Sequence, residues 1–124
     1  MNKPKKQRQN ITAIIYDKRG RILSIGKNNY NKTHPRMYQL SRSVKGYDEY
    51  CKIYLHAEMD AIVKCSQLDK AHLIEIYRIS PDGNYRLAKP CPICRSAIIQ
   101  TPIKYVKYSG NYDQYITVKT NELN

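Results

Sequence analysis

The sequence predicts an α/β fold in which strands alternate with helices along one chain of 124 residues. Three observations support this prediction. Two β-branched runs flank a glycine-containing turn near the N-terminus, two later segments have the helical spacing of apolar residues, and apolar runs of strand length lie between and after them. A chain of this length can bury one core, so residues 10–124 are expected to form a single domain.

The chain begins with a polar segment, residues 1–9, that is rich in lysine and arginine and has no apolar run behind it. We expect a flexible basic arm here and not a secretory signal. No run in the sequence approaches the length of a membrane-spanning helix. The expected setting is therefore the cytoplasm, without contact to a membrane, where cysteines stay reduced or bind metals.

Residues 11–16 and 21–26 are expected to form a β-hairpin, because both runs are β-branched and the sequence between them ends in Gly20. Residues 27–36 contain Pro35 and predict a loop. The pattern of residues 37–54 is ambiguous, since Gly46 interrupts a segment that could be helical on either side.

Two helices are predicted, one beginning near His56 and the other near Pro92. Helical spacing links Ala61, Ile62, Cys65 and Leu68 in the first segment, and Cys94, Ala97, Ile98 and Thr101 in the second. Residues 71–79, 103–109 and 115–119 predict strands, and residues 81–84 predict a turn.

A metal site is predicted from His56, Cys91 and Cys94. The two cysteines are three residues apart at a helix start, so both thiols can point to one side. Two converging helix N-termini would place partial positive charge there and favour thiolates. Three protein ligands leave one tetrahedral position open, which is typical of a catalytic zinc. We therefore predict one Zn²⁺ per chain, bound by these residues.

Glu58 is the predicted catalytic residue. It follows His56 by two residues and can reach the site without being a ligand. Zinc lowers the pKa of a bound water, and Glu58 could carry that water's proton to a ring nitrogen and to leaving ammonia. A structural zinc site would need a fourth ligand. Cys65 would lie about 13 Å away along a helix axis, which is too far, whereas spacing does not exclude Cys51.

The two motifs His56-Ala57-Glu58 and Pro90-Cys91-Pro92-Ile93-Cys94 together resemble the H-x-E…P-C-x-x-C signature of the cytidine and deoxycytidylate deaminase superfamily. The resemblance extends over about residues 10–110. It implies a three-layer α/β/α fold with a mixed five-stranded sheet, and hydrolytic deamination as the activity. The signature alone does not separate cytosine from adenine, or a free nucleotide from a polynucleotide.

The resemblance also implies substrate-binding residues. Gly26-Lys27-Asn28 resembles the G-x-N motif of the family, which implies that Asn28 binds the sugar. The backbones of Ala57 and Pro90 are implied to contact the edge of the base. Tyr108 resembles an aromatic residue beside the base or sugar, although packing within the sheet is the alternative role. The stretch Lys32-Thr33-His34-Pro35, together with His56-Ala57-Glu58 and residues 88–94 downstream, is most similar to short phage-encoded deoxycytidylate deaminases. His34 is either a phosphate contact or a loop residue.

The charge of the chain is concentrated before the metal motifs. The formal net charge is +12, and residues 1–47 hold twelve lysines and arginines but one acid, Asp17. Such a field favours partners that carry phosphate, and a solvated surface is the alternative explanation.

Three functions are compatible with these features. The first is deamination of a cytosine nucleotide, dCMP to dUMP. The second is deamination of cytosine or adenine within single-stranded DNA or RNA, because one phosphate does not need so large a charge and the twelve tyrosines suit base stacking. The third is a non-catalytic deaminase fold that binds nucleic acid. Deaminases of this fold often associate, so a homo-oligomer is compatible with the resemblance, and the sequence leaves the oligomeric state open.

Overall fold

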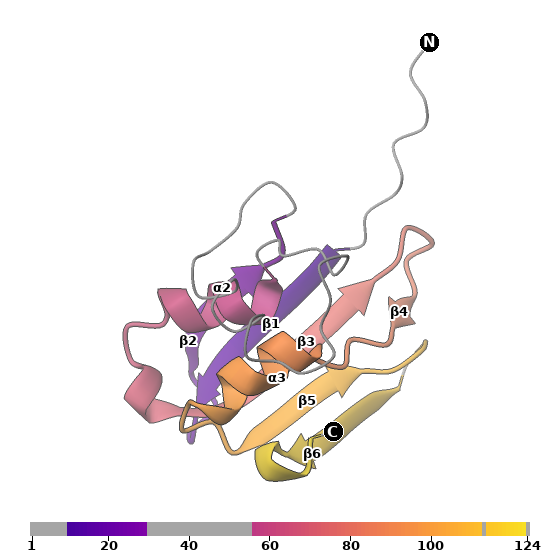
Figure 1. Cartoon of the computed structure of the whole chain (residues 1–124). Coiled ribbons are helices and arrows are strands. Elements are labelled where there is room, and N and C mark those ends of the chain that lie inside the picture. The colour runs from indigo at the N-terminus through magenta and orange to yellow at the C-terminus, as the bar shows by residue number, and fades with distance from the viewer. Residues whose placement is uncertain (1–9, 30–55, 113, 124) are drawn as a thin grey trace.

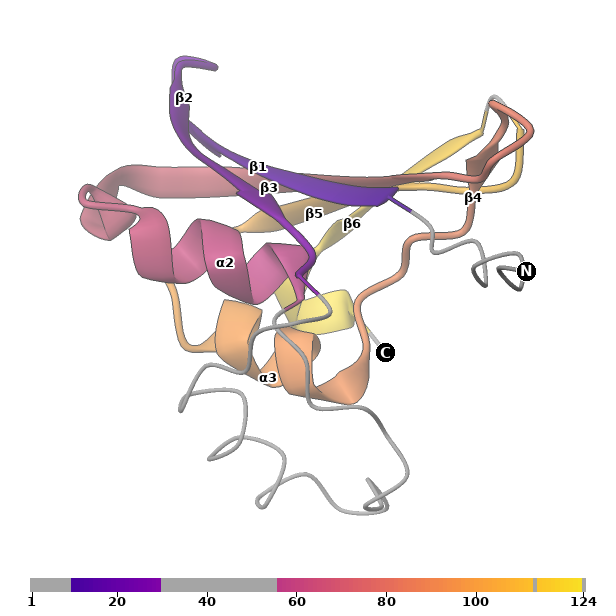
Figure 2. The same ribbon diagram turned by 90° about the horizontal axis from the view of Figure 1, so that it is seen from above.

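The computed structural model describes residues 10–29, 56–112 and 114–123, and in them one mixed sheet carries two helices on one face (Figures 1 and 2). The strands are β1 (Asn10–Asp17), β2 (Ile22–Lys27), β3 (Ala71–Ile79), β4 (Tyr85–Arg86), β5 (Tyr105–Ser109) and β6 (Tyr115–Lys119). The helices are α2 (Ala57–Lys64) and α3 (Pro92–Ile99). No helix in these ranges is both long and apolar enough to cross a membrane.

The sheet has the strand order β2-β1-β3-β5-β6, and the short β4 pairs with the end of β3. β3 is antiparallel to β1 and parallel to β5. The connection from β3 to β5 contains α3, as a parallel pair requires a crossover. The mixed α/β class is confirmed, with one strand more than the five expected, because the chain after the turn at Pro81–Asn84 pairs back onto Arg78 and Ile79.

Both helices lie on the same side of the sheet (Figure 2). The second helical layer that a three-layer arrangement requires is not among the described residues. The segments expected to be a basic arm, a loop and an ambiguous helix, residues 1–9 and 30–55, lie outside the described ranges. That residues 10–124 form a single domain stays a prediction.

The β1–β2 hairpin confirms the expected turn, which the Asp17 carboxylate organises. Its Oδ1 accepts hydrogen bonds from the backbone N–H groups of Arg19 and Arg21, both at 2.9 Å. Gly20 has a φ of 81°, a left-handed conformation that favours glycine at this position.

Both helices end earlier than the apolar spacing predicts. α2 ends at Lys64, and Leu68 begins a separate 3-10 turn (Leu68–Lys70). α3 ends at Ile99, because the Thr101 hydroxyl donates to the carbonyl of Ile98 at 2.6 Å and Pro102 follows. Apolar spacing therefore predicted where these helices begin better than where they end.

The core lies between the sheet and the two helices. It contains apolar side chains from the central strands and from the facing sides of the helices: Ala13, Ile15, Ile74, Ile76, Val106, Ala57, Ala61 and Ile98. Burying these groups against one another holds the N-termini of both helices at a fixed position over the sheet.

Candidate metal centre and active site

The predicted ligands sit at the first positions of the two helices. His56 is the N-cap residue of α2 and Cys91 is the N-cap residue of α3, and both have extended backbones. Neither side chain caps its own helix. Pro92 occupies the first turn of α3, where its missing N–H costs nothing, and Cys94 follows it in the same turn. Both N-cap side chains therefore point out of their helices toward a common site.

Nδ1 of His56 lies 3.4 Å from Sγ of Cys91 and 3.3 Å from Sγ of Cys94. The three ligand atoms all lie within 4.8 Å of one another. Tetrahedral zinc with ordinary bonds to nitrogen and sulfur separates such atoms by about 3.6 Å. The one-nitrogen, two-sulfur set therefore fits a zinc ion without rearrangement of the helices.

The pKa values of the two cysteine thiols shift in opposite directions. The hydrogen bond from Cys94, supported by one from His56, lowers the pKa of Cys91 to about 4. The same bond and burial raise the pKa of Cys94 well above its usual value. The half-buried Cys91 thus carries a thiolate readily, and a cation at the centre would favour the second thiolate as well.

Glu58 lies in the first turn of α2, next to the ligands. Its side chain is buried, with 5% of the residue exposed. Burial raises the pKa of the Glu58 carboxyl, because a low-dielectric environment disfavours the charged form. A buried carboxyl beside the metal ligands can hold a proton and release it, which suits a proton carrier.

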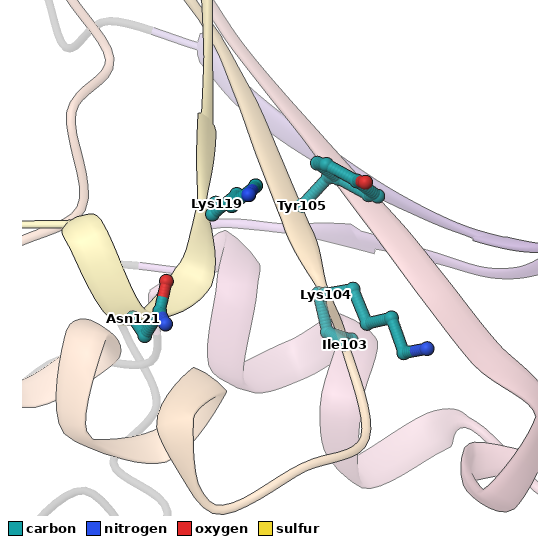
Figure 3. Close-up of a pocket in the computed structure, with 5 residues that line it drawn as sticks. All are labelled: Ile103, Lys104, Tyr105, Lys119 and Asn121. Atoms are coloured by element: carbon teal, nitrogen blue, oxygen red, sulfur yellow. The ribbon is translucent and has the colours of Figure 1, made fainter.

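A cavity of about 140 Å³ opens onto this group of residues. Its wall contains Ile11 and Ile76 from the sheet, His56 and Glu58 from the start of α2, and Arg78, Leu87, Ala88, Lys89 and Cys91 from β3 and the segment before α3. A second cavity of about 330 Å³ lies away from the metal site, between Ile103, Lys104, Tyr105, Lys119 and Asn121 (Figure 3). It has no histidine, cysteine or acid in its wall, so the smaller cavity is the candidate active site.

Sequence reasoning did not identify Arg78 as a residue of this cavity. β3 places Ile74 and Ile76 in the core on its helix-facing side, and Arg78 is the next residue on that side. A charge that interrupts an apolar alternation near the end of a central strand is the signal that could have found it.

Asn28 is bound to the start of β1. Its Oδ1 accepts the backbone N–H of Ile11 at 3.0 Å, and its own N–H donates to the Ile11 carbonyl at 3.3 Å. Ile11 lines the cavity, whereas Asn28 is not among the lining residues. A role of Asn28 in binding the sugar stays a prediction.

The other three substrate-binding candidates, Ala57, Pro90 and Tyr108, are all buried. Ala57 is fully buried between His56 and Glu58, and Pro90 is buried directly before Cys91. Their backbone contacts with a base stay predictions. Tyr108 lies on β5 beside Ile76 and belongs to the hydrophobic core, with 7% of the residue exposed. It does not line the cavity, so its position favours the packing role.

The alternative of a structural zinc depends on a fourth ligand. Cys65 caps the far end of α2 and does not belong to the cluster of ligand atoms. Cys51 lies outside the described residues, as do His34 and eight of the twelve basic residues before position 48. In the described ranges the cluster has three ligands.

Comparisons with known proteins agree with this site. The model of the cytidine and deoxycytidylate deaminase zinc-binding region matches residues 1–109. ComE operon protein 2 of Bacillus subtilis is 36% identical over 67 residues, which cover 52% of this chain but 31% of that protein. The chain thus spans about a third of that relative's length. The crystal structure of cytidine deaminase from Burkholderia pseudomallei aligns with a TM-score of 0.62 at 13% identity, covering 97% of this chain and 82% of the other. This likeness shows that the fold is shared.

Proposed function

Since the chain belongs to the cytidine and deoxycytidylate deaminase family, we propose that this zinc-dependent deaminase converts a cytosine nucleotide, dCMP, to dUMP and ammonia. The observation that carries the proposal is that His56, Cys91 and Glu58 line one small cavity together with two cationic side chains. At about 140 Å³ the cavity is well below the roughly 300–1,000 Å³ typical of drug-sized ligands. It suits a single ring, with the sugar and phosphate toward its mouth.

His56, Cys91 and Cys94 would hold the zinc ion, which, when bound, supplies a Lewis acid that makes water nucleophilic near neutral pH. Glu58 carries the protons. It accepts one from the attacking water and delivers protons to the ring nitrogen and to the departing amino group, so that ammonia leaves and a carbonyl remains at C4. The backbones of Ala57 and Pro90 hold the base edge, and Asn28 holds the sugar.

The ionisation of Glu58 supports this role. Its burial favours the neutral acid, while the neighbouring His56 opposes that effect. Ile11, Ile76 and Leu87 give the cavity wall an apolar part, and less polar surroundings strengthen interactions with developing charge.

The test is to incubate the zinc-loaded protein with dCMP, CMP, deoxycytidine, cytosine-containing single-stranded DNA and adenosine-containing tRNA, and to measure ammonia release. We expect dCMP to react fastest. Replacement of Glu58 by Gln should lower kcat by about 10²–10⁴-fold while zinc stays bound. The matched control is Glu75→Gln, because Glu75 lies on the sheet face without helices, bonded to Tyr16 at 2.9 Å. Full activity of Glu58→Gln would sink the mechanism.

One observation favours a polynucleotide as a second candidate substrate, namely the charge of +11 in residues 1–47. Binding to single strands should weaken steeply as salt rises, whereas a single nucleotide should show a shallow salt dependence. A wide preference for the oligonucleotide over dCMP would select this candidate. Binding of nucleic acid without any deamination would instead support the non-catalytic alternative. The proposal also includes that the protein acts in the cytoplasm, that it is of the short phage-encoded type and that it forms a homo-oligomer.

A further inference from the structure

Arg78 places a guanidinium group in the wall of the active-site cavity. It lies near the end of β3, on the helix-facing side where Ile74 and Ile76 are buried. The cavity wall that contains Arg78 also contains His56, Glu58 and Cys91. Arg78 thus lines the same cavity as the reacting groups without being a metal ligand.

The Nε atom of Arg78 is buried and has no hydrogen-bond acceptor among the described residues. The backbone N–H of Arg78 is satisfied by the hydroxyl of Ser109 at 3.1 Å, so the unpaired donor belongs to the side chain. Buried donors in folded proteins are nearly always paired, so an unpaired donor in a cavity wall is available to a ligand atom.

The charge of Arg78 is also unbalanced, since no ion pair of this side chain is found in the part of the chain that the structure describes. Lys89 adds a second cation to the same wall, and Glu58 is the one carboxylic acid there. A neutral carbonyl would satisfy the hydrogen bond of Nε but would leave the charge unpaired. An anion satisfies both.

We propose that Arg78 binds the 5′-phosphate of the substrate through its guanidinium edge and thereby selects a nucleotide over a nucleoside. Guanidinium matches phosphate geometry with two parallel N–H donors, which a lysine cannot present. Lys89, which is exposed, adds a point charge at the mouth. The proposal rests on the proposed deaminase function and names the residue that selects nucleotides over nucleosides.

The kinetic test compares dCMP with deoxycytidine for the wild type and for Arg78→Gln. We expect kcat/KM for dCMP to fall on the order of 100-fold and kcat/KM for deoxycytidine to change by less than about threefold. Arg78→Lys should recover part of the preference for dCMP. The control is Arg19→Gln, which removes the same charge from the turn after β1, at the end of that strand opposite to Ile11. It should leave both substrates unaffected.

The binding test does not depend on turnover. Titration calorimetry with dUMP, deoxyuridine and inorganic phosphate should show that Arg78→Gln weakens dUMP and phosphate while deoxyuridine is unchanged. Equal weakening of dUMP and deoxyuridine would mean that Arg78 contacts the base, and unchanged dUMP binding would mean that it contacts no substrate; either result overturns the proposal. If the wild type deaminates no nucleotide but binds dUMP through Arg78, the proposed function fails and this inference stands.

The variants are expected to fold, because the Arg78 side chain makes none of the hydrogen bonds or ion pairs found in the described residues. Equal melting temperatures of Arg78→Gln and Arg19→Gln would establish this. Rescue of the dCMP preference by Arg78→Lys separates loss of a phosphate contact from a packing defect, since a packing defect would lower activity on both substrates.

Discussion

Gly26 of β2 touches the backbone of Ala57 in α2. A Cβ atom at Gly26 would lie 2.3 Å from the carbonyl oxygen of Ala57 and 2.3 Å from the backbone nitrogen of Ala61. Strand and helix therefore meet without any side chain between them. Because Ala57 stands between His56 and Glu58, this contact fixes how closely a metal ligand and the proposed acid–base residue approach the sheet.

Replacement of Gly26 by alanine should therefore push α2 away from β2. The atoms in the way are backbone atoms and cannot rotate aside, so we expect a loss of unfolding free energy on the order of 3 kcal/mol, at the upper end for overpacking. Zinc affinity should fall too, since His56 moves with the helix. Urea denaturation and zinc titration measure the two effects.

Gly110→Ala is the matched control for Gly26→Ala. A Cβ there meets the side chain of Gln114, whose Cβ is 3.1 Å away and whose amide can move. We expect a cost below about 1 kcal/mol and no change in zinc affinity. Similar losses in the two variants would show that close approach at Gly26 is not what positions α2.

The hydroxyl of Ser109 joins three strands next to the cavity. It accepts the backbone N–H of Arg78 at 3.1 Å and donates to the carbonyl of Arg86 at 2.7 Å, and the residue is fully buried. Ser109→Ala leaves both partners unsatisfied, which should cost on the order of 3 kcal/mol. In Thr120→Val one carbonyl, that of Ile103, loses its donor, so about half that cost is expected. Thermal or urea unfolding of both variants decides whether the costs differ.

The zinc content of serine variants should distinguish Cys94, a predicted ligand, from Cys65, which lies outside the ligand cluster. Cys94 is fully buried in the ligand cluster, whereas Cys65 is half-buried at the far end of α2. Cys94→Ser is expected to lose bound zinc, because a serine hydroxyl is a much poorer zinc ligand than a thiolate, and Cys65→Ser should keep one zinc per chain. Metal analysis of the purified proteins gives the answer. Stoichiometric zinc in Cys94→Ser would refute the ligand assignment.

Local patterns in the sequence predicted the metal site well because its parts are local. Cys91 and Cys94 are one helical turn apart, and a helix start near His56 follows from apolar spacing. The meeting of the two helix starts was assumed in the metal-site prediction, since no local pattern records which helices lie side by side.

The cavity wall was harder to predict because it is made by tertiary contacts. Arg78 reaches the site through the register of β3 with its neighbours, and Leu87 and Ala88 reach it through a segment without periodicity. Gly26 stood out in the sequence as part of a motif, but its physical reason, the contact with α2, becomes visible in the folded chain. The helix end at Ile99 was missed because the Thr101 hydroxyl bond and Pro102 override apolar spacing there. At the end of α2, the backbone N–H of Cys65 bonds back to the carbonyl of Ile62.

Glu58 gives the metal-free protein a characteristic pH dependence. Burial raises the pKa of its carboxyl above the ordinary value of 4.5, so the folded state keeps a proton that the unfolded state has lost. The free energy of unfolding should then decrease as pH rises from about 4.5 through the raised pKa, by about 1.4 kcal/mol for each unit of the shift. Glu58→Gln should lack this decrease and be more stable than the wild type at neutral pH.

Asp17 contributes to the pH dependence of the unfolding free energy with the opposite sign. Hydrogen bonds from the backbone N–H groups of Arg21 and Arg19 and from the side chain of Arg21 lower the pKa of the Asp17 carboxyl below 3.8. The stabilisation by Asp17 is present above pH 3.8 and is lost as pH falls. In Asp17→Asn, the unfolding free energy should therefore fall less at acidic pH, while its decrease above pH 4.5 should be unchanged. Urea denaturation of the metal-free variants between pH 3 and pH 8 measures both changes in unfolding free energy. If Glu58→Gln shows the same decrease in unfolding free energy above pH 4.5 as the wild type, the folded protein does not raise the pKa of the Glu58 carboxyl.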